Sequence, residues 1–282
     1  MIDLHCHSIF SDGTDTPEEL ALQGDALGLT ALALTDHDTL AGLDRFLAMQ
    51  PRVSTRLIPG IELSCRFLGR VLHVLGLFVD PQEPSLAALV TDMRERRVRR
   101  NQLMVARLQA LGVPILWEDI AAEAPTDLIS RTHFARVIMR LRAAGSPQDA
   151  FKRFIGDDAP GFVPMVELLP ADAARAIRGA GGVAVVAHPG RGVPRSFRWD
   201  QAMADLKTMG LQGFEAYYPD YGPLEEQYFL ELAATLDMVP TGGSDHHGGH
   251  KPGQSLGVGR GSLAVPDGIL ARLEALRVPK AV

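Results

Sequence analysis

The sequence predicts an α/β fold in which short buried strands alternate with amphipathic helices. Seven short runs rich in apolar and β-branched residues recur along the chain, and helical patterns separate several of them. Polar residues cluster directly after most of these runs. The carboxyl ends of parallel strands meet at one mouth of a barrel, so polar clusters at these positions favour a barrel over an open sheet.

The expected strands occupy residues 1–7, 30–35, 56–63, 71–79, 182–187, 213–218 and 238–241. The clearest helix follows the first of them. Thr16-Pro17-Glu18-Glu19 has the pattern of a capping box with a proline in the first turn, and an amphipathic run continues to Leu27. Gly28 then fits a helix C-cap.

The pattern changes between about residues 82 and 170. Strand signals vanish there, and long helical stretches rich in arginine replace them, at 85–111 and 132–144. We therefore expect a barrel in two parts, residues 1–81 and 171–282, with a small helical insertion at 82–170 that binds substrate.

Composition narrows the class of protein. The chain has 282 residues, 46% hydrophobic and 22% charged, as is usual for a soluble globular protein. Neither a secretory leader nor an apolar run long enough to cross a bilayer is recognisable, so we expect a cytoplasmic protein with no membrane association. The net charge of −6 argues against a nucleic-acid binder without sequence preference. Cys6 and Cys65 are too few for a disulfide framework, and we expect both to be inert packing residues.

Two histidine-rich clusters lie at opposite ends of the sequence. His5 and His7 are two residues apart on an expected strand, so both imidazoles project from one face, as two ligands of one ion require. Asp245 and His247 form the second cluster. Further candidate ligands lie in or after expected strands: Asp12, His37, Glu62, His73 and His188. Mixed nitrogen and oxygen ligands suit Zn, Mn or Fe and fit poorly with Ca or a dedicated Mg site.

These residues stand in motifs with a fixed order. The motifs are Asp3-Leu4-His5-x-His7 with Ser11-Asp12-Gly13, Thr35-Asp36-His37-Asp38, Gly60-Ile61-Glu62, His73, Ala187-His188-Pro189 and Gly243-Ser244-Asp245-x-His247. Together they resemble the polymerase and histidinol phosphatase (PHP) family of metallophosphoesterases. Within the expected insertion, Arg131-Thr132-His133-Phe134-Ala135-Arg136 resembles the branch that contains nucleoside 3′,5′-bisphosphate phosphatases and 5′→3′ exoribonucleases of the RNase AM type.

The resemblance implies a distorted (β/α)7 barrel that holds three divalent metal ions, with Mn²⁺ expected ahead of Fe²⁺ or Zn²⁺. The implied ligand sets are His5, His7, Glu62 and Asp245 for one ion, Glu62, His73 and His188 for a second, and Asp12, His37 and His247 for a third. Three such ions carry about six positive charges, and three carboxylates with one hydroxide leave about two, which match a phosphate monoester dianion. A metal-bridging hydroxide would attack phosphorus.

Other residues are candidates for catalysis and for substrate binding. Asp36 lies beside a candidate ligand, as do Asp3 and Asp38, and we expect these aspartates to orient histidines, with an ordinary turn or capping role as the alternative for Asp38. Arg131 could bind phosphate as a bidentate fork, and His133 could bind phosphate or act as the general acid that protonates the leaving oxygen. The alternative is an arginine at a helix end and a histidine that only packs.

The remaining substrate candidates are arginines and tyrosines. Arg100 belongs to an arginine run along one helix that is either a nucleotide path or an ordinary solvated face. Arg191 and Arg195 follow His188 near the expected barrel mouth and could meet a second phosphate. Tyr217 or Tyr218 could stack on a base or pack in the core. His246 is a weaker ligand candidate than His247, and His250 is expected to be a solvent-exposed loop histidine.

The favoured function is a metal-dependent phosphoesterase that removes phosphate from nucleotides or trims nucleotides from the 5′ end of short RNA. No stable protein partner is expected. One alternative is a phosphatase on another small phosphate ester such as histidinol phosphate, which would not need the insertion. A C–N bond hydrolase fits less well, because the expected site balances a dianion. A non-catalytic, metal-stabilised interaction module would lack ligands, whereas every expected ligand position is filled.

Overall fold

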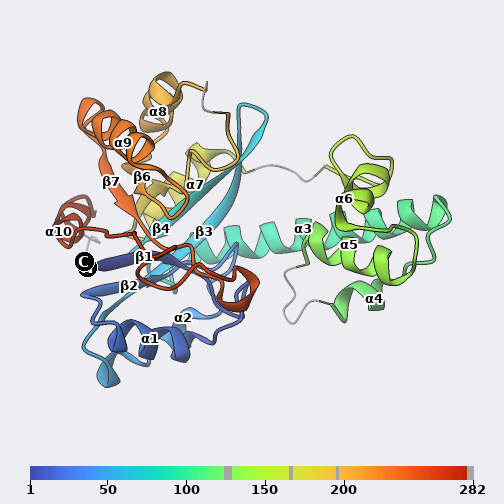
Figure 1. Ribbon diagram of the computed structural model, residues 1–282, viewed down its shortest axis with the longest axis horizontal. Helices are drawn as coiled ribbons and strands as arrows, with labels where there is room; N and C mark the ends of the chain where they lie inside the picture. Colours follow the sequence, from blue (N-terminus) through green and yellow to red (C-terminus); the bar gives the residue numbers. More distant parts are fainter. Residues whose placement is uncertain (124–128, 165–167, 195–196, 278–282) are drawn as a thin grey trace. The chain divides into compact units, whose positions relative to one another are not determined.

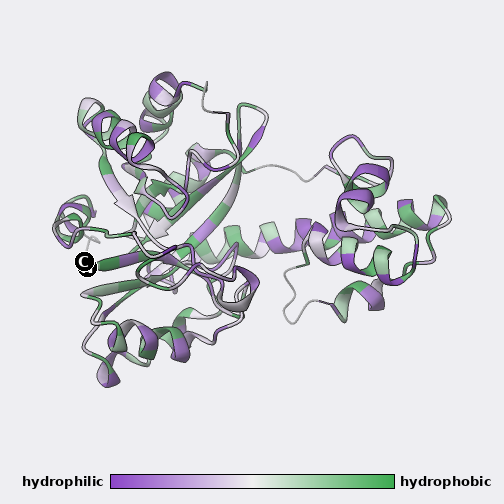
Figure 2. Cartoon of the chain, viewed as in Figure 1, coloured by the Kyte–Doolittle hydropathy of each residue, from purple (hydrophilic) through white to green (hydrophobic). Residues whose placement is uncertain are grey.

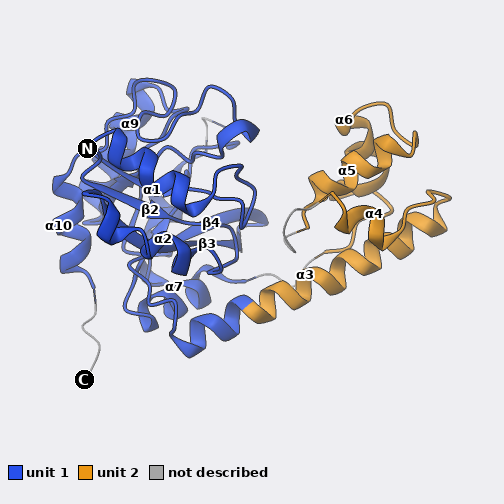
Figure 3. Ribbon diagram, turned by 90° about the horizontal axis from the view of Figure 1, so that it is seen from below, with its two compact units in different colours: residues 1–90, 167–282 blue, residues 91–166 orange. Residues whose placement is uncertain are grey.

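The computed structural model describes residues 1–123, 129–164, 168–194 and 197–277. It divides into two compact units, which are Met1–Val90 with Glu167–Val282 (unit 1) and Thr91–Val166 (unit 2) (Figure 3). The sequence places the ends of the insertion at 82 and 170. Unit 2 begins at Thr91, later than residue 82, because one uninterrupted helix, α3 (Pro84–Ala110), begins in unit 1 and continues into unit 2. Its apolar start buries Leu86, and its middle is hydrophilic (Figure 2).

Unit 1 is built on a seven-stranded sheet whose strands are neighbours in chain order (Figure 1). The strands are β1 (Ile2–Cys6), β2 (Ala31–Leu34), β3 (Arg56–Phe67), β4 (Arg70–Leu77), β5 (Val183–Val186), β6 (Gly213–Tyr217) and β7 (Val239–Gly242). This confirms the expected seven-stranded α/β barrel, with β3 longer than the sequence predicts.

One strand departs from a parallel barrel. β4 runs antiparallel to both β3 and β5, whereas the other neighbouring strands pair in parallel. The reversal arises because Leu68 and Gly69, with φ of 49° and 73°, form a two-residue hairpin turn between the paired residues Phe67 and Arg70. As a result, the beginning of β4 lies beside the carboxyl ends of the parallel strands, and His73 reaches the mouth from there.

The two ends of the sheet meet. The segment after β7 pairs with β1: the His7 N–H donates to the carbonyl of His246 at 2.9 Å, and the Asp245 N–H donates to the carbonyl of His5 at 2.8 Å. These bonds nearly close the sheet into a barrel. They also place the histidine-rich clusters from opposite ends of the sequence side by side.

Helices pack on the outside of the sheet in unit 1 (Figure 1). They are α1 (Pro17–Ala26), α2 (Leu43–Leu47), α7 (Pro170–Gly179), α8 (Trp199–Thr208), α9 (Pro223–Thr235) and α10 (Gly268–Ala275). α1 begins with the predicted capping box, in which Thr16 Oγ1 accepts the Glu19 N–H and a Glu19 carboxylate oxygen accepts the Thr16 N–H. No helix in the described ranges is long and apolar enough to cross a membrane.

The interior of the barrel changes from apolar to polar along the strands. Side chains two or four residues apart on a strand share a face, so Ile58 lies on the same face of β3 as Glu62, and Leu75 on the same face of β4 as His73. Ile58 and Leu75 belong to one buried cluster with residues of the other strands, including Leu4, Ala33, Val185 and Val239. This apolar layer supports the polar mouth.

Unit 2 has its own hydrophobic core. Besides the latter part of α3 it contains α4 (Trp117–Ala121), α5 (Arg131–Arg140), α6 (Pro147–Ala150) and a short helical turn at Phe151–Ile155. Its core residues include Met104, Leu108, Ile115, Phe134, Ile138 and Ile155. Within residues 91–123 and 129–164 there is no strand.

Candidate metal centre

Glu62 is the centre of the polar mouth. Its carboxylate is fully buried, and five imidazoles converge on it from different segments of unit 1. The ring nitrogens near Oε2 are Nε2 of His5, Nε2 of His7 and Nδ1 of His37, each at 3.1 Å; those near Oε1 are Nδ1 of His73 at 2.8 Å and Nε2 of His188 at 3.1 Å. One carboxylate is therefore shared by two groups of ligand atoms.

The electrostatics keep Glu62 ionised. Burial alone would raise the pKa of this carboxyl group, but the charges of His37, His5 and His73 outweigh it and hold the pKa well below its usual value. A buried anion of this kind needs cationic partners to offset its desolvation.

The arrangement of nitrogen atoms fits bound cations. Nε2 of His5 and Nε2 of His7 lie only 3.0 Å apart, and both face Glu62. Nδ1 of His37 and Nδ1 of His73 are buried without a hydrogen bond, although both lie close to a Glu62 oxygen. Once deprotonated, imidazoles that converge on carboxylate oxygens form a donor set for divalent transition metals. The residues therefore fit divalent metal ions.

All nine ligand candidates lie together. Their ligand atoms form four overlapping groups, within each of which the atoms lie within 4.8 Å of one another. The groups are His7, Asp12, His37 and His247; His5, His7 and Asp245; His5, Glu62 and His188; and His37, Glu62 and His73. Three residues here have positive φ, namely Asp38, His188 and Asp245, a backbone conformation that costs energy outside glycine.

Glu215 is a functional residue that the sequence analysis missed. Its Oε1 accepts a hydrogen bond from Nδ1 of His5 at 2.9 Å, which leaves Nε2 of His5 free to face Glu62. Its Oε2 accepts the backbone N–H of His188 at 2.6 Å. The sequence did contain an indication of this role. Glu215 lies in the middle of the otherwise apolar strand β6, and a carboxylate buried there must have a hydrogen-bonding partner.

We expect Glu215→Gln to lower metal affinity roughly 10- to 100-fold, the effect of losing a group that orients a ligand. The amide keeps the shape of the side chain but cannot accept hydrogen bonds at both positions. Metal titration of the purified variant measures the change, and excess metal should restore most of the activity. Unchanged metal affinity would contradict the orienting role of Glu215.

Asp245 is held by a second set of groups. Its Oδ2 accepts hydrogen bonds from the Tyr218 hydroxyl and from Nζ of Lys251, both at 2.7 Å, and Nη1 of Arg191 lies 3.8 Å away. Its Oδ1 faces Nε2 of His7 at 3.3 Å. Tyr218 is therefore fixed by its hydroxyl at the metal centre, and Arg191 lies at the same mouth.

The carboxylates of Asp36 and Asp3 accept hydrogen bonds from loop residues. Asp36 accepts hydrogen bonds from the Ser8 N–H at 2.7 Å and from the hydroxyls of Ser8 and Ser11, both at 2.6 Å. Asp3 accepts the N–H groups of Ser244 and Gly257. Asp36 therefore holds the loop that precedes Asp12, and it is linked to a candidate ligand through the Ser11 hydroxyl, which lies 3.4 Å from Nδ1 of His7.

The two other C-terminal histidines are also engaged. His246 uses both ring nitrogens, one with the carbonyl of Gln254 and one with Asp15, so it has no nitrogen left for a metal. His250 is exposed, as expected of a loop histidine, and its Nδ1 lies 2.8 Å from the carbonyl of Asp12.

The predicted residues of the insertion lie in unit 2. Nη1 of Arg131 donates to Asp157 at 2.6 Å, and its guanidinium lies over the ring of Phe162. Nδ1 of His133 accepts the N–H of Ser130 at the start of α5. Burial, followed by the charges of Arg97 and Arg131, lowers the pKa of Arg100 to about 10. The structure thus brings Arg100 and Arg131 into one positively charged region. Arg195 lies outside the described residues.

Protons compete with metal for His7. Burial alone would lower the pKa of this imidazole, but its hydrogen bonds with Asp245 and Glu62 raise the pKa to about 9 in the metal-free protein. A metal ligand must be neutral, so metal uptake expels this proton. We expect affinity to rise with pH up to about 9, with proton release measurable by calorimetry in buffers of different ionisation enthalpy. Equal affinities at about pH 7 and about pH 9 would contradict this ionisation.

Comparisons with known proteins agree with this geometry. A family model described as the PHP domain matches residues 3–105. The chain is 32% identical over 246 residues to the 5′-3′ exoribonuclease of Haemophilus influenzae, a match that covers 87% of this chain and 89% of that protein. It is 34% identical over 257 residues to the 3′,5′-nucleoside bisphosphate phosphatase of Chromobacterium violaceum, covering 91% and 90%.

Solved structures extend the likeness to the whole fold. A protein of Bifidobacterium adolescentis assigned as a metal-dependent phosphoesterase superposes with a TM-score of 0.82 at 31% identity, covering 99% of this chain and 97% of that one. An amidohydrolase of Chromobacterium violaceum with bound sulfate and no metal gives a TM-score of 0.78 at 33% identity, covering 98% and 97%. The mouth built on Glu62, the seven-stranded barrel and these matches over nearly the whole chain show that the protein belongs to the PHP domain family.

Proposed function

We propose that the protein is a metal-dependent phosphoesterase that acts on nucleotides, by removing the 3′-phosphate of nucleoside 3′,5′-bisphosphates, by releasing nucleotides from the 5′ end of short RNA, or both. The observation that carries this proposal is the buried Glu62 carboxylate shared by five imidazoles. Relatives named for these two activities match about nine-tenths of the chain, which supports the nucleotide as substrate.

We propose three divalent ions, with Mn²⁺ as the preferred metal. The ligand arrangement supports more than one ion, because three imidazoles lie near Oε2 of Glu62 and two others lie near Oε1. Asp12 is half exposed, at 49% of its side chain, and a third ion beside it would lie nearest to solvent. Nitrogen-rich ligand sets of this type favour Mn, Fe or Zn over Ca.

Bound divalent ions would supply Lewis acidity and a water of lowered pKa for attack on phosphorus. The chain's own residues hold and orient the participants. Tyr218 and Lys251 fix Asp245 through one oxygen. Arg191, at the same mouth, is placed to bind a phosphoryl oxygen.

Unit 2 would contribute substrate binding in this proposal. The positive charge of Arg131 lies close enough to Arg100 to lower its pKa, and a phosphate group of the substrate would offset the repulsion between the two. His133, whose Nδ1 accepts the Ser130 N–H, would bind phosphate or protonate the leaving oxygen through its other ring nitrogen.

A side-by-side assay tests the proposal. Protein reconstituted with Mn²⁺ is offered nucleoside 3′,5′-bisphosphates, 5′-phosphorylated oligoribonucleotides, histidinol phosphate and a cyclic phosphodiester. We expect turnover of the first, the second or both. Stepwise release of mononucleotides from the 5′ end that depends on Arg131 would indicate exonuclease activity. Turnover of none of the four by metal-loaded protein would overturn the proposal.

A C–N bond hydrolase is the second candidate, because one structural relative is named an amidohydrolase. The same relative contains sulfate, a tetrahedral dianion similar in shape and charge to a phosphate group. This favours the phosphoesterase, and an amide substrate in the same assay separates the two.

A further inference from the structure

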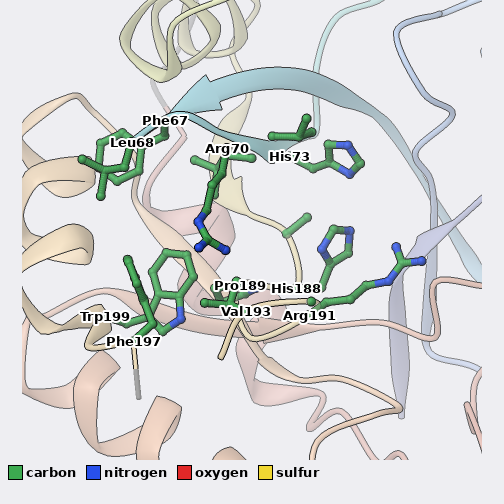
Figure 4. Close-up of a pocket in the computed structure, with 14 residues that line it drawn as sticks. Phe67, Leu68, Arg70, His73, His188, Pro189, Arg191, Val193, Phe197 and Trp199 are labelled. Atoms are coloured by element: carbon green, nitrogen blue, oxygen red, sulfur yellow. The ribbon is translucent and has the colours of Figure 1, made fainter. Parts of the chain in front are cut away.

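A pocket opens from the metal centre along the β3–β4 hairpin of unit 1. Its cavity volume is about 270 Å³. His73 and His188 line one side (Figure 4), and both side chains contact Glu62. The pocket is therefore continuous with the site at which the proposed function places phosphate hydrolysis. None of the residues described above as metal ligands, except these two histidines, lines it.

The far side of the pocket is aromatic. Phe67 contributes from the end of β3, and Phe197 and Trp199 contribute from the start of α8 and the segment before it. The rings of Phe197 and Trp199 meet edge to face, with centroids 4.8 Å apart. Flat ring surfaces in a cavity next to a phosphate site suit a planar aromatic ligand.

Arg70 adds a charged group to this aromatic lining. Its side chain extends from β4 into the pocket, towards Trp199 and Phe197 (Figure 4). Among the residues that the structure describes, no carboxylate pairs with Arg70, whereas Arg191 at the other side lies near Asp245. A planar guanidinium can stack on a ring or donate hydrogen bonds to ring nitrogens and carbonyl oxygens.

We propose that this pocket binds the nucleobase of the phosphate ester that the metal centre cleaves, with Phe197 and Trp199 as the ring contacts and Arg70 as the polar contact. The inference rests on the proposed function and deepens it, because it gives the enzyme a reason to prefer nucleotides over other phosphate esters. The aromatic side lies in the same cavity as His73 and His188, so base and phosphoryl group occupy one continuous site.

The lining favours a base over a second phosphate. A phosphate bound on this side would meet one arginine among apolar rings, whereas phosphate sites normally surround the anion with several donors. A cavity volume of about 270 Å³ is also slightly below the usual range for small-ligand pockets, roughly 300–1,000 Å³, and suits one nucleoside rather than a chain of several.

Tryptophan fluorescence tests binding without turnover. The chain has two tryptophans, Trp117 in unit 2 and Trp199 in the pocket. In a Trp117→Phe variant of the full chain, the emission reports Trp199 alone. We expect a nucleoside monophosphate to quench this emission at a concentration at which ribose 5-phosphate does not. Arg70→Gln should weaken the quenching. Trp199 also lines a second cavity, with Pro223, Leu224 and Phe229, but Arg70 lines only the first, so this variant shows which cavity the nucleotide enters.

Kinetics provide the second test. Phe197→Leu and Arg70→Gln should raise KM for a nucleoside 3′,5′-bisphosphate roughly 5- to 150-fold, the range that loss of one base–aromatic contact gives. KM for abasic ribose 3,5-bisphosphate should not change. Arg175→Gln is the matched control, because Arg175 is an exposed arginine on α7 outside the pocket.

The outcomes separate this inference from the proposed function. Equal quenching by nucleoside monophosphate and ribose 5-phosphate, or an equal rise in KM for both bisphosphates, would overturn the base-binding pocket while the phosphoesterase stands. Selective quenching by the nucleotide in a protein that hydrolyses no phosphate ester would support the pocket and overturn the proposed function.

Discussion

Glu62→Gln is expected to lower turnover more than about 100-fold, because even groups that only orient a metal ligand are worth about 10- to 100-fold. The amide keeps the volume of the side chain but carries no charge. Its NH2 group would also face imidazole nitrogens that now face a carboxylate oxygen. Elemental analysis of the purified variant should show fewer bound ions per chain, alongside the loss of turnover on a nucleotide substrate.

The matched control for this variant is Glu231→Gln, which makes the same change at an exposed position on α9. We expect this control to keep full metal content and activity. A Glu62→Gln protein that is folded, fully loaded with metal and active would show that Glu62 is not shared between ions.

Gly243→Ala is expected to have the second largest effect, on both stability and metal binding. A Cβ atom at this position would lie 2.4 Å from Cβ of His5 and 2.5 Å from its backbone nitrogen. No rotamer change relieves a contact with backbone, so β1 must shift, and His5 must move with it. Overpacking of this kind costs about 1–3 kcal/mol of unfolding free energy.

Denaturant unfolding of the metal-free protein measures the stability change, and metal titration measures the second effect. Gly268→Ala is the control, since a Cβ at that position at the start of α10 meets nothing within 4 Å. If Gly243→Ala left both stability and metal affinity at the level of Gly268→Ala, the barrel would not be closed as tightly as described.

Much of the fold could be predicted because its signals are local. The strands combine apolar, β-branched runs with a polar group at one end. This pattern arises because one face of a strand lines both the apolar layer of the barrel and its polar mouth, as Ile58 and Glu62 do on β3. The helix after β1 is equally local, since its capping box needs only Thr16 and Glu19. The ligand candidates could be predicted in the same way, because each lies in or after a strand that the sequence itself indicates.

The features that the sequence did not predict depend on distant partners. The reversal of β4 follows from the turn at Leu68 and Gly69, which has no marker beyond one glycine. The role of Glu215 depends on His5, which lies far away in the chain. Asp36 sits beside His37 in the sequence, yet its carboxylate bonds to Ser8 and Ser11 across the fold. The partners of this carboxylate therefore depend on the fold and not on its position next to His37 in the sequence.

The closure of the barrel by the segment after β7 has a consequence for biosynthesis. His5 and His7 leave the ribosome early, whereas Asp245 and His247, which complete their ligand groups, are translated long afterwards. Until Asp245 and His247 are made, the groups in which they join His7 are incomplete. A chain that stops before residue 245 therefore lacks a member of two of the four ligand groups, and the centre is complete only in the closed barrel.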